Sequence, residues 1–282
     1  MIAMDKMSLL ETGGAILALL LVMGLFLVGC EKKLIFHPQK YPEGVWDTSN
    51  FGFPVEDVYF KSADGVWLHG WYVPASQPEG TLLWFHGNAG NLTHRWGNIA
   101  QLRFLNLNVF IFDYRGYGRS EGQPSEAGIY RDAEAAYLTL MQKKEVSPER
   151  LILFGRSLGA APATHVALKH PAAGLILESA FTSARDMADA LFPVLPVGFL
   201  IRSDMNVLER VAQIKIPKLI LHGNKDEVVP YALGKKLFQA AAEPKTFYEI
   251  ENAGHNDTYL AGGQSYYAAW ENFVRQVTLP GK

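Results

Sequence analysis

Apolar and polar positions alternate with two different periods along most of the chain, which indicates both helices and strands. Patterns with a helical period occur at 92–105, 126–144, 158–169, 231–241 and 257–277. Apolar runs typical of strands lie at 55–60, 67–73, 81–85, 109–112, 151–154, 174–177, 218–221 and 246–250. From the third run onward they are almost continuously apolar, as expected for parallel strands buried on both faces. The pattern predicts a doubly wound α/β fold around a mostly parallel, eight-stranded sheet.

The first two runs differ from the rest because their residues alternate between apolar and polar. The segment that joins them contains Asp64-Gly65, a dipeptide typical of tight turns. We therefore expect an antiparallel hairpin at one edge of the sheet. Residues 31–282 contain no evident repeat or low-complexity stretch, so they are predicted to form a single domain.

The first thirty residues carry a different pattern. No charged residue occurs from Thr12 to Cys30, and residues 15–28 are apolar on every side. A surface helix needs a polar face, so this run is predicted to enter or cross a membrane. Its end, Leu27-Val28-Gly29-Cys30, resembles a bacterial lipoprotein box, in which the cysteine is lipidated and becomes the mature N-terminus. Cys30 is the candidate lipidation site, and residues 1–30 would then be the lipoprotein signal.

The same run could instead be an uncleaved membrane anchor. The segment before it has little positive charge, whereas Lys32 and Lys33 follow it. By the positive-inside rule, an uncleaved helix would leave the following domain in the cytoplasm. Lipidation would place that domain in the periplasm or at the cell exterior. The single cysteine of the chain lies in the lipoprotein box. We therefore expect lipidation of Cys30 and keep the uncleaved anchor as the alternative.

Composition removes several classes of function. Lysine and arginine total 26 against 28 aspartate and glutamate residues, a net charge of −2, which predicts no basic surface for nucleic acid. One cysteine excludes a disulfide framework and a cysteine-based zinc site. Apolar residues make up 49% of the chain, which excludes extensive disorder. An enzyme or a globular binding module remains.

The strand run 151–154 leads directly into Gly155-Arg156-Ser157-Leu158-Gly159 and then into a helical pattern. A strand, a G-x-S-x-G sequence and a helix form the context in which this motif marks a nucleophilic serine. The turn lifts the serine oxygen out of the sheet, and the glycines avoid collisions with the neighbouring strand and helix. A phosphate loop would need a Gly-Lys-Ser/Thr ending, which is absent. Ser157 is therefore the candidate nucleophile.

A nucleophilic serine needs a base, and the base needs a carboxylate that fixes its tautomer. In folds of this kind the order along the chain is serine, acid, histidine. Asp226 and His255 follow the last two strand runs in that order, and His255 alone among eight histidines lies after the last run. We therefore expect Asp226 as the acid and His255 as the base. Glu178, which ends the strand run 174–177, is the rival acid.

The loop after the third strand run contains His86-Gly87-Asn88-Ala89-Gly90. An early strand-to-helix loop of this architecture supplies the second oxyanion donor, and the residue after the nucleophile supplies the first. The backbone N–H groups of Asn88 and Leu158 are the candidate oxyanion hole. A glycine-rich turn without catalytic meaning is the alternative for the loop.

The connection at 181–213 is longer than a minimal link between two neighbouring strands. Its centre, residues 191–200, is apolar and contains Pro193 and Pro196. A segment at this position either forms a lid that suits an acyl chain or packs against the core or the membrane surface. Both possibilities stay open at this point.

Motifs from residue 34 to residue 257 together resemble the α/β-hydrolase superfamily, and within it the membrane-anchored serine hydrolases whose eukaryotic members include depalmitoylating enzymes. The resemblance rests on the segments 34–38, 85–91, 113–122, 155–159, 177–183, 222–230 and 253–257. It implies Ser157 as nucleophile, Asp226 as acid and His255 as base. It also implies that residues 113–122 form a turn packed beside the active site.

These observations predict a membrane-tethered serine hydrolase that cleaves carboxylic esters or thioesters of a small or acyl-bearing substrate. No metal or organic cofactor is needed for this chemistry, and no nucleic acid is expected as a partner. A serine peptidase with the same triad is one alternative. A non-catalytic lipoprotein that uses the fold as a binding module is the other.

Overall fold

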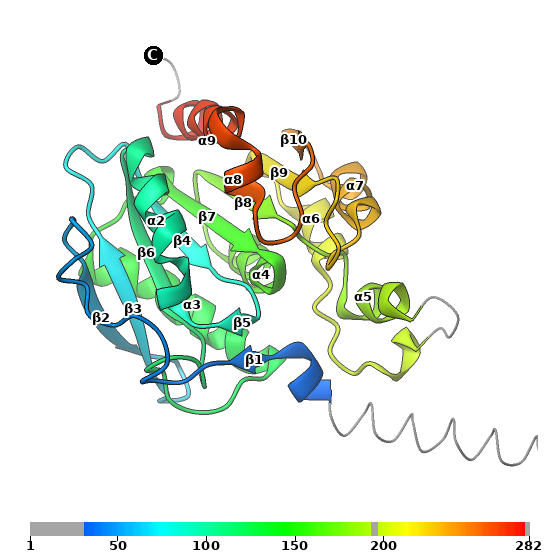
Figure 1. The fold of residues 1–282 in the computed structure, drawn as a ribbon, viewed down its shortest axis with the longest axis horizontal. Coiled ribbons are helices and arrows are strands. Elements are labelled where there is room, and N and C mark those ends of the chain that lie inside the picture. Colours follow the sequence, from blue (N-terminus) through cyan, green and yellow to red (C-terminus); the bar gives the residue numbers. More distant parts are fainter. Residues whose placement is uncertain (1–30, 193–196, 280–282) are drawn as a thin grey trace, which may run out of the picture.

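The computed structural model describes residues 31–192 and 197–279, and one sheet of eight strands runs through its centre (Figure 1). Its spatial order is β10-β9-β8-β7-β4-β6-β3-β2. The strands are β2 (Glu56–Lys61), β3 (Trp67–Val73), β4 (Gly80–Phe85), β6 (Leu107–Asp113), β7 (Leu151–Arg156), β8 (Gly174–Glu178), β9 (Lys218–Gly223) and β10 (Lys245–Ile250). Every strand run expected from the sequence is present, with ends that shift by at most two residues.

The pairing of the strands confirms the mostly parallel, doubly wound arrangement. β2 and β3 form the expected antiparallel hairpin at one edge, and β3 also pairs antiparallel with β6. From β6 to β10 every neighbouring pair is parallel. The inner parallel strands are buried along their whole length, because helices cover both faces of the sheet.

Helices on the two faces enclose two separate apolar layers. One layer packs beneath α3 (Glu126–Lys143), α4 (Ala160–Lys169), α6 (Val207–Gln213) and α7 (Tyr231–Ala240). The other packs beneath α2 (Trp96–Leu102) and α9 (Gly263–Thr278). Short 3-10 turns η3 (Pro148–Arg150) and η4 (Ser157–Gly159) flank β7. The carboxyl ends of the parallel strands stay open between these layers, which is where such folds bind ligands.

Two helices that the sequence predicts as single are divided. The segment 92–105 consists of η1 (Leu92–Arg95), α2 and η2 (Arg103–Leu105). The segment 257–277 divides into α8 (Thr258–Ala261) and α9 at Gly262 and Gly263. Gly263 has a positive φ of 50°, a conformation that ends a helix and favours glycine.

The long connection after β8 is largely helical. It contains α5 (Ala184–Leu191), η5 (Gly198–Leu200) and α6, of which the sequence pattern predicted none. Ala188, Val197 and Ile201 form a small apolar cluster of their own, apart from the two main layers. The part of the connection with α5 and η5 therefore has its own packing, with α5 to the right of α4 in Figure 1, whereas α6 packs on one of the main layers.

Residues 31–35 are helical, and β1 (His37–Pro38) then pairs with β5 (Ala89–Gly90) in a parallel two-stranded sheet. We call residues 31–38 the N-terminal strap. The predicted signal or anchor at 1–30 and the lipidation candidate Cys30 lie outside the described residues. Among the helices of the described part, none combines the length and apolar character needed to span a membrane.

Candidate active site

Ser157 lies at the sharp turn between β7 and α4, at the carboxyl end of the sheet. Its φ of 52° is in the left-handed region, which a residue with a side chain rarely adopts. A methyl group at Gly159 would lie 1.8 Å from the backbone oxygen of Phe85, and one at Gly155 would lie 2.6 Å from the oxygen of Gly159. Only glycine fits at both positions, so the turn can hold the serine hydroxyl above the sheet.

The three predicted triad residues come together although they are distant in the sequence. Nε2 of His255 lies 3.1 Å from Oγ of Ser157. Nδ1 of the same ring lies 2.8 Å from Oδ2 and 3.1 Å from Oδ1 of Asp226. With Nδ1–H donating to the carboxylate, Nε2 is left free to accept the serine proton.

The carboxylate of Asp226 is buried and held by several donors. The backbone N–H groups of Val228 and Val229 donate to its Oδ1 at 2.9 and 2.8 Å. Burial raises the pKa of Asp226, but hydrogen bonds from His222 and His255 outweigh that effect and hold the pKa well below its usual range. Nε2 of His222 lies 3.4 Å from Oδ2 of Asp226, and the sequence analysis did not assign this histidine to the site. The acid is therefore ionised wherever the enzyme is folded near neutral pH.

Glu178, the rival acid, has a different set of partners. Its fully buried carboxylate accepts hydrogen bonds from Thr258 at 2.7 Å and from Tyr266 at 2.6 Å, and Nε of Arg156 lies 3.1 Å away. Burial, together with the charge of Glu178, raises the pKa of Tyr266 well above its usual value, so its hydroxyl remains a donor. Arg156 also donates to the backbone oxygen of His255 at 2.5 Å. This geometry favours Asp226 as the acid and gives Glu178 a place behind the histidine loop.

The candidate oxyanion loop lies directly against the nucleophile. A methyl group at Gly87 would lie 3.5 Å from Cβ of Ser157, so the His86-Gly87-Asn88 backbone passes beside the serine. The hydroxyl of Tyr114 donates to the backbone oxygen of His86 at 3.0 Å, and that of Tyr117 to the oxygen of Asn88 at 2.8 Å. The predicted turn at 113–122 thus packs beside the active site and holds the oxyanion loop through these two hydroxyl groups. Leu158, which follows the serine, is buried beside it.

The N-terminal strap contacts both sides of the site. The amide nitrogen of the Asn88 side chain donates to the backbone oxygen of Ile35 at 3.1 Å, and the N–H of His37 donates to the oxygen of Asn88 at 3.2 Å. On the other side, the carboxylate of Glu31 accepts the backbone N–H groups of Arg202 and Ser203 at 3.1 and 2.7 Å. The strap thereby bridges the oxyanion loop and the long connection after β8, an arrangement with no signal in the sequence.

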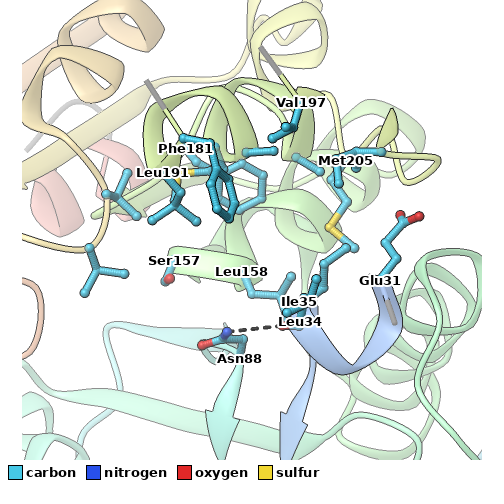
Figure 2. Close-up of a pocket in the computed structure, with 17 residues that line it drawn as sticks. Glu31, Leu34, Ile35, Asn88, Ser157, Leu158, Phe181, Leu191, Val197 and Met205 are labelled. Carbon is cyan, nitrogen blue, oxygen red and sulfur yellow. Dashed lines mark hydrogen bonds between the residues drawn. The ribbon is translucent and has the colours of Figure 1, made fainter. Parts of the chain in front are cut away.

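A cavity of about 320 Å³ opens beside Ser157 (Figure 2). Figure 2 shows Ser157 and Leu158 on its floor, with Phe181 and Leu191 above them and the strap at one side. Most of its wall is apolar and comes from the connection at 181–213: Phe181, Met187, Leu191, Val197, Ile201 and Met205. The acidic group among the described lining residues is Glu31, whose oxygens are already used by backbone N–H groups. The cavity suits an apolar chain extending from the serine.

Within residues 31–192 and 197–279, no group of three or more histidine, cysteine, aspartate or glutamate side chains is placed to hold a metal ion. The remaining histidines have other contacts. His86 is buried with Nδ1 2.7 Å from the backbone oxygen of Gly87, and His165 pairs with Glu134 on α3 at 2.6 Å. His255 is the histidine that contacts Ser157.

Comparison with known proteins identifies related sequences over nearly the whole chain. A family model described as "Serine aminopeptidase, S33" matches residues 76–199 and 194–258. An uncharacterised protein of Mycobacterium tuberculosis is 36% identical over 260 residues, covering 92% of this chain and 92% of the relative. The alpha/beta hydrolase domain-containing protein WAV2 of Arabidopsis thaliana is 36% identical, covering 89% of each. Protein bem46 of Schizosaccharomyces pombe is 34% identical, covering 94% and 92%.

Solved structures share the fold at lower sequence identity. An esterase of Pyrococcus furiosus superposes with a TM-score of 0.70 at 21% identity, covering 86% of this chain and 98% of the esterase. An esterase of Exiguobacterium antarcticum superposes with a TM-score of 0.62 at 17% identity, covering 78% of this chain and all of the esterase. At these identities the similarity shows that the fold is shared, and no more.

Proposed function

The chain belongs to the α/β-hydrolase family of serine hydrolases described as serine aminopeptidase, S33, and on that premise we propose that it is a membrane-tethered hydrolase of acyl esters or thioesters. One observation carries the proposal: the hydroxyl of Ser157, within reach of His255, opens on an apolar cavity of about 320 Å³. An acyl chain could fill that cavity while its carbonyl carbon lies at Oγ of Ser157.

Each triad residue has a definite part in the proposed reaction. Oγ of Ser157 attacks the acyl carbonyl carbon while Nε2 of His255 takes the hydroxyl proton. Asp226 keeps the ring oriented and stabilises its positive charge. The proton then passes to the departing alcohol or thiol, which leaves an acyl-serine. Water attacks this ester with the same histidine as base, and the products are a carboxylic acid and the free serine.

The negative oxygen that forms at the carbonyl needs donors that are already in place. Backbone N–H groups of Asn88 and Leu158 are proposed for this role because both residues line the cavity beside Ser157. Each such donor typically lowers the barrier by about 3 kcal/mol. The contacts of Tyr117 and His37 with the backbone oxygen of Asn88 fix the peptide that follows the donating N–H, and would restrain the backbone of Asn88 before substrate arrives.

Tethering is proposed from the sequence of residues 1–30, where an apolar run precedes Cys30. Lipidation of Cys30, with the domain in the periplasm or at the cell exterior, is the arrangement we favour. Mass spectrometry of the N-terminus tests it. A diacylglyceryl group on Cys30 is expected, whereas an unmodified Met1 followed by intact residues 1–30 would favour the uncleaved anchor.

The catalytic proposal is tested with a panel of short and long p-nitrophenyl esters, an acyl thioester and a peptide amide. Hydrolysis of the esters or the thioester is expected, together with covalent labelling by a fluorophosphonate probe. Ser157→Ala should lose both, and undiminished turnover in this variant would refute the mechanism. Cleavage of the amide alone would favour a peptidase, and absence of labelling in the folded protein would favour a binding module.

A further inference from the structure

Several large apolar side chains are exposed around the mouth of the Ser157 cavity. Leu34, Leu191, Phe192 and Val228 line the cavity and are at the same time exposed to solvent. Phe199 on η5 is 76% exposed and does not line the cavity itself, but Val197 and Ile201 on either side of it do. We call Phe199 and the four exposed lining residues the apolar rim. A cluster of exposed large apolar residues typically marks an interaction surface.

The rim comes from segments that are held together by specific contacts. The N–H of Gly198, next to Phe199, donates to Oδ1 of Asp189 on α5 at 2.7 Å, so η5 packs against the helix that ends at Leu191. Leu34 belongs to the N-terminal strap, which Glu31 joins to the backbone of Ser203. These hydrogen bonds fix the segments that carry the rim residues relative to one another.

Glu31 makes the position of the strap specific. Its side chain is 6% exposed, and both of its oxygens accept backbone N–H groups. Burial raises the pKa of Glu31, but the hydrogen bonds from Ser203 and Arg202 outweigh that effect and lower it. An ionised carboxylate at this point can keep the first turn of the described chain fixed against the long connection.

The rim begins where the apolar N-terminal segment of the sequence ends. Residues 15–28 form that apolar segment, and Leu34 follows it by six positions. Lys32 and Lys33 are exposed between the two. Lysines beside an apolar surface are typical of the membrane interface, where they meet anionic headgroups.

We infer that the apolar rim rests on the lipid bilayer and that the acyl chain of the substrate enters the cavity directly from the lipid. This inference rests on the proposed tether and on Ser157 as the nucleophile. The tether brings the domain to the membrane, and the strap decides which side of the domain faces it. In Figure 2, Leu191 lies above Ser157 and Leu34 lies to its lower right on the strap, so two separate segments border the cavity with apolar side chains that lipid could contact.

Exposure alone does not identify this surface, because Phe104 is 82% exposed on another side of the molecule. Phe104 lies in η2, immediately before the amino end of β6, whereas the cavity lies at the carboxyl ends of the parallel strands. No rim residue neighbours it in the sequence. Phe104 is therefore the matched control for Phe199.

The test uses the full chain reconstituted in vesicles of phosphatidylcholine and phosphatidylglycerol. Phe199→Cys and Phe104→Cys are each labelled with a polarity-sensitive fluorophore, and the unsubstituted chain gives the background from Cys30. A label at 199 is expected to shift its emission to shorter wavelength and to lose most of its intensity when the vesicles contain brominated lipid. A label at 104 should do neither. Equal responses at the two positions would overturn the inference.

A second pair of variants tests delivery of the substrate. Phe199→Glu should lower the rate on a long-chain p-nitrophenyl ester dissolved in the vesicles, relative to a short water-soluble ester, by about tenfold, the factor expected when one phenyl ring loses its apolar surroundings. Phe104→Glu should leave this ratio as in the unsubstituted chain. An unchanged ratio in Phe199→Glu would contradict entry from the lipid.

Sedimentation with the vesicles and fluorophosphonate labelling, measured on the same samples, separate the two proposals. A chain that labels and sediments but shows no quenching at 199 keeps its proposed function and refutes the rim. A chain that does not sediment refutes both the tether and the rim. A chain that sediments with quenching at 199 but does not label keeps the rim on the membrane and refutes the catalytic proposal and acyl entry together.

Discussion

The guanidinium group of Arg156 donates a hydrogen bond of 2.5 Å to the backbone oxygen of His255. Arg156 immediately precedes the nucleophile, so one side chain connects the serine turn to the loop of the histidine. Its Nε also lies 3.1 Å from Glu178, which two hydroxyl groups hold from the other side. Arg156 is thus placed as a positioning residue that keeps His255 over Ser157.

Arg156→Gln should lower kcat by about 10- to 100-fold with little change in KM, because a shift of the histidine by about 1 Å is enough for such a loss. Ester hydrolysis and the rate of fluorophosphonate labelling measure the effect. Since removal of one partner of a buried ion pair costs about 3–5 kcal/mol of stability, assays at low temperature and circular dichroism must accompany it. Equal loss through KM alone would contradict a positioning role.

Tyr266→Phe is the milder variant of the same network. It removes one hydrogen bond to Glu178 and leaves the ion pair with Arg156, so the free energy of unfolding should fall by about 1–3 kcal/mol. If the network positions His255, kcat should fall by less than in Arg156→Gln and KM should again change little. A normal kcat in a destabilised protein would restrict Tyr266 to a structural role.

The choice between Asp226 and Glu178 can be tested directly. Asp226→Asn should lower kcat by about 10⁴-fold, because an amide favours the wrong tautomer of His255. Ester hydrolysis at saturating substrate measures it. Asp47→Asn is the matched control, since Asp47 is exposed and its carboxylate contacts Ser49 away from the site. A loss in Asp226→Asn no larger than in the control would restore Glu178 as the candidate acid.

The pH dependence follows from the lowered pKa of Asp226. Because this carboxylate stays ionised well below its usual range, the fall of kcat/KM on the acid side should reflect protonation of one group, with a slope of one, down to about pH 4. A slope of two within that range, measured with the short ester, would show that the acid titrates together with the base.

The same pKa predicts how stability changes with pH. The unfolded chain binds the proton of Asp226 at its ordinary pKa of about 4, while the folded chain binds it only at lower pH. The stabilising contribution is therefore complete above about pH 4 and is lost as pH falls through the folded value. Urea unfolding should show a steeper loss of stability below about pH 4 in the unsubstituted chain than in Asp226→Asn.

The sheet and the turn that carries Ser157 could be predicted because their signals are local. A buried parallel strand is an uninterrupted apolar run, and β8, for example, was expected over 174–177, where the structure has Gly174–Glu178. The turn at Ser157 needs glycine on both sides, and the G-x-S-x-G motif at residues 155–159 shows both glycines in the sequence. Helix continuity was harder, since the break before α9 depends on Gly262 and Gly263 within an otherwise helical pattern.

The contacts around the triad could not be predicted because each one joins residues far apart in the sequence. Glu31 and Ser203 are 172 positions apart, and Arg156 and His255 are 99 apart. The contact of Glu31 depends on the path of the connection after β8, whose helices α5 and α6 are short and were not predicted. In α5 the apolar residues at 184, 187, 188 and 191 do recur at helical spacing, a signal that the sequence analysis missed. His222 had a weak signal, as it lies near the end of β9, four positions before Asp226.

A substitution on α5 can test whether the cavity limits the length of the acyl chain. Ala188 lines the cavity, whereas Ala190, on the same helix, is exposed and does not. Each methylene that leaves water contributes about 0.8 kcal/mol, so kcat/KM should rise about fourfold per added methylene until the cavity is full. Ala188→Phe places a phenyl ring in that space and should stop this rise at a shorter chain.

Ala190→Phe adds the same ring outside the cavity and should leave the dependence on chain length as in the unsubstituted chain. A homologous series of p-nitrophenyl esters, kept below their micelle-forming concentrations, measures kcat/KM for all three proteins. If Ala188→Phe and Ala190→Phe reach the same optimal length, the acyl chain does not occupy the cavity beside Ser157. A shorter optimum in Ala188→Phe alone would place the acyl chain along α5, because this variant changes the space at one wall and leaves Ser157, His255 and Asp226 unaltered.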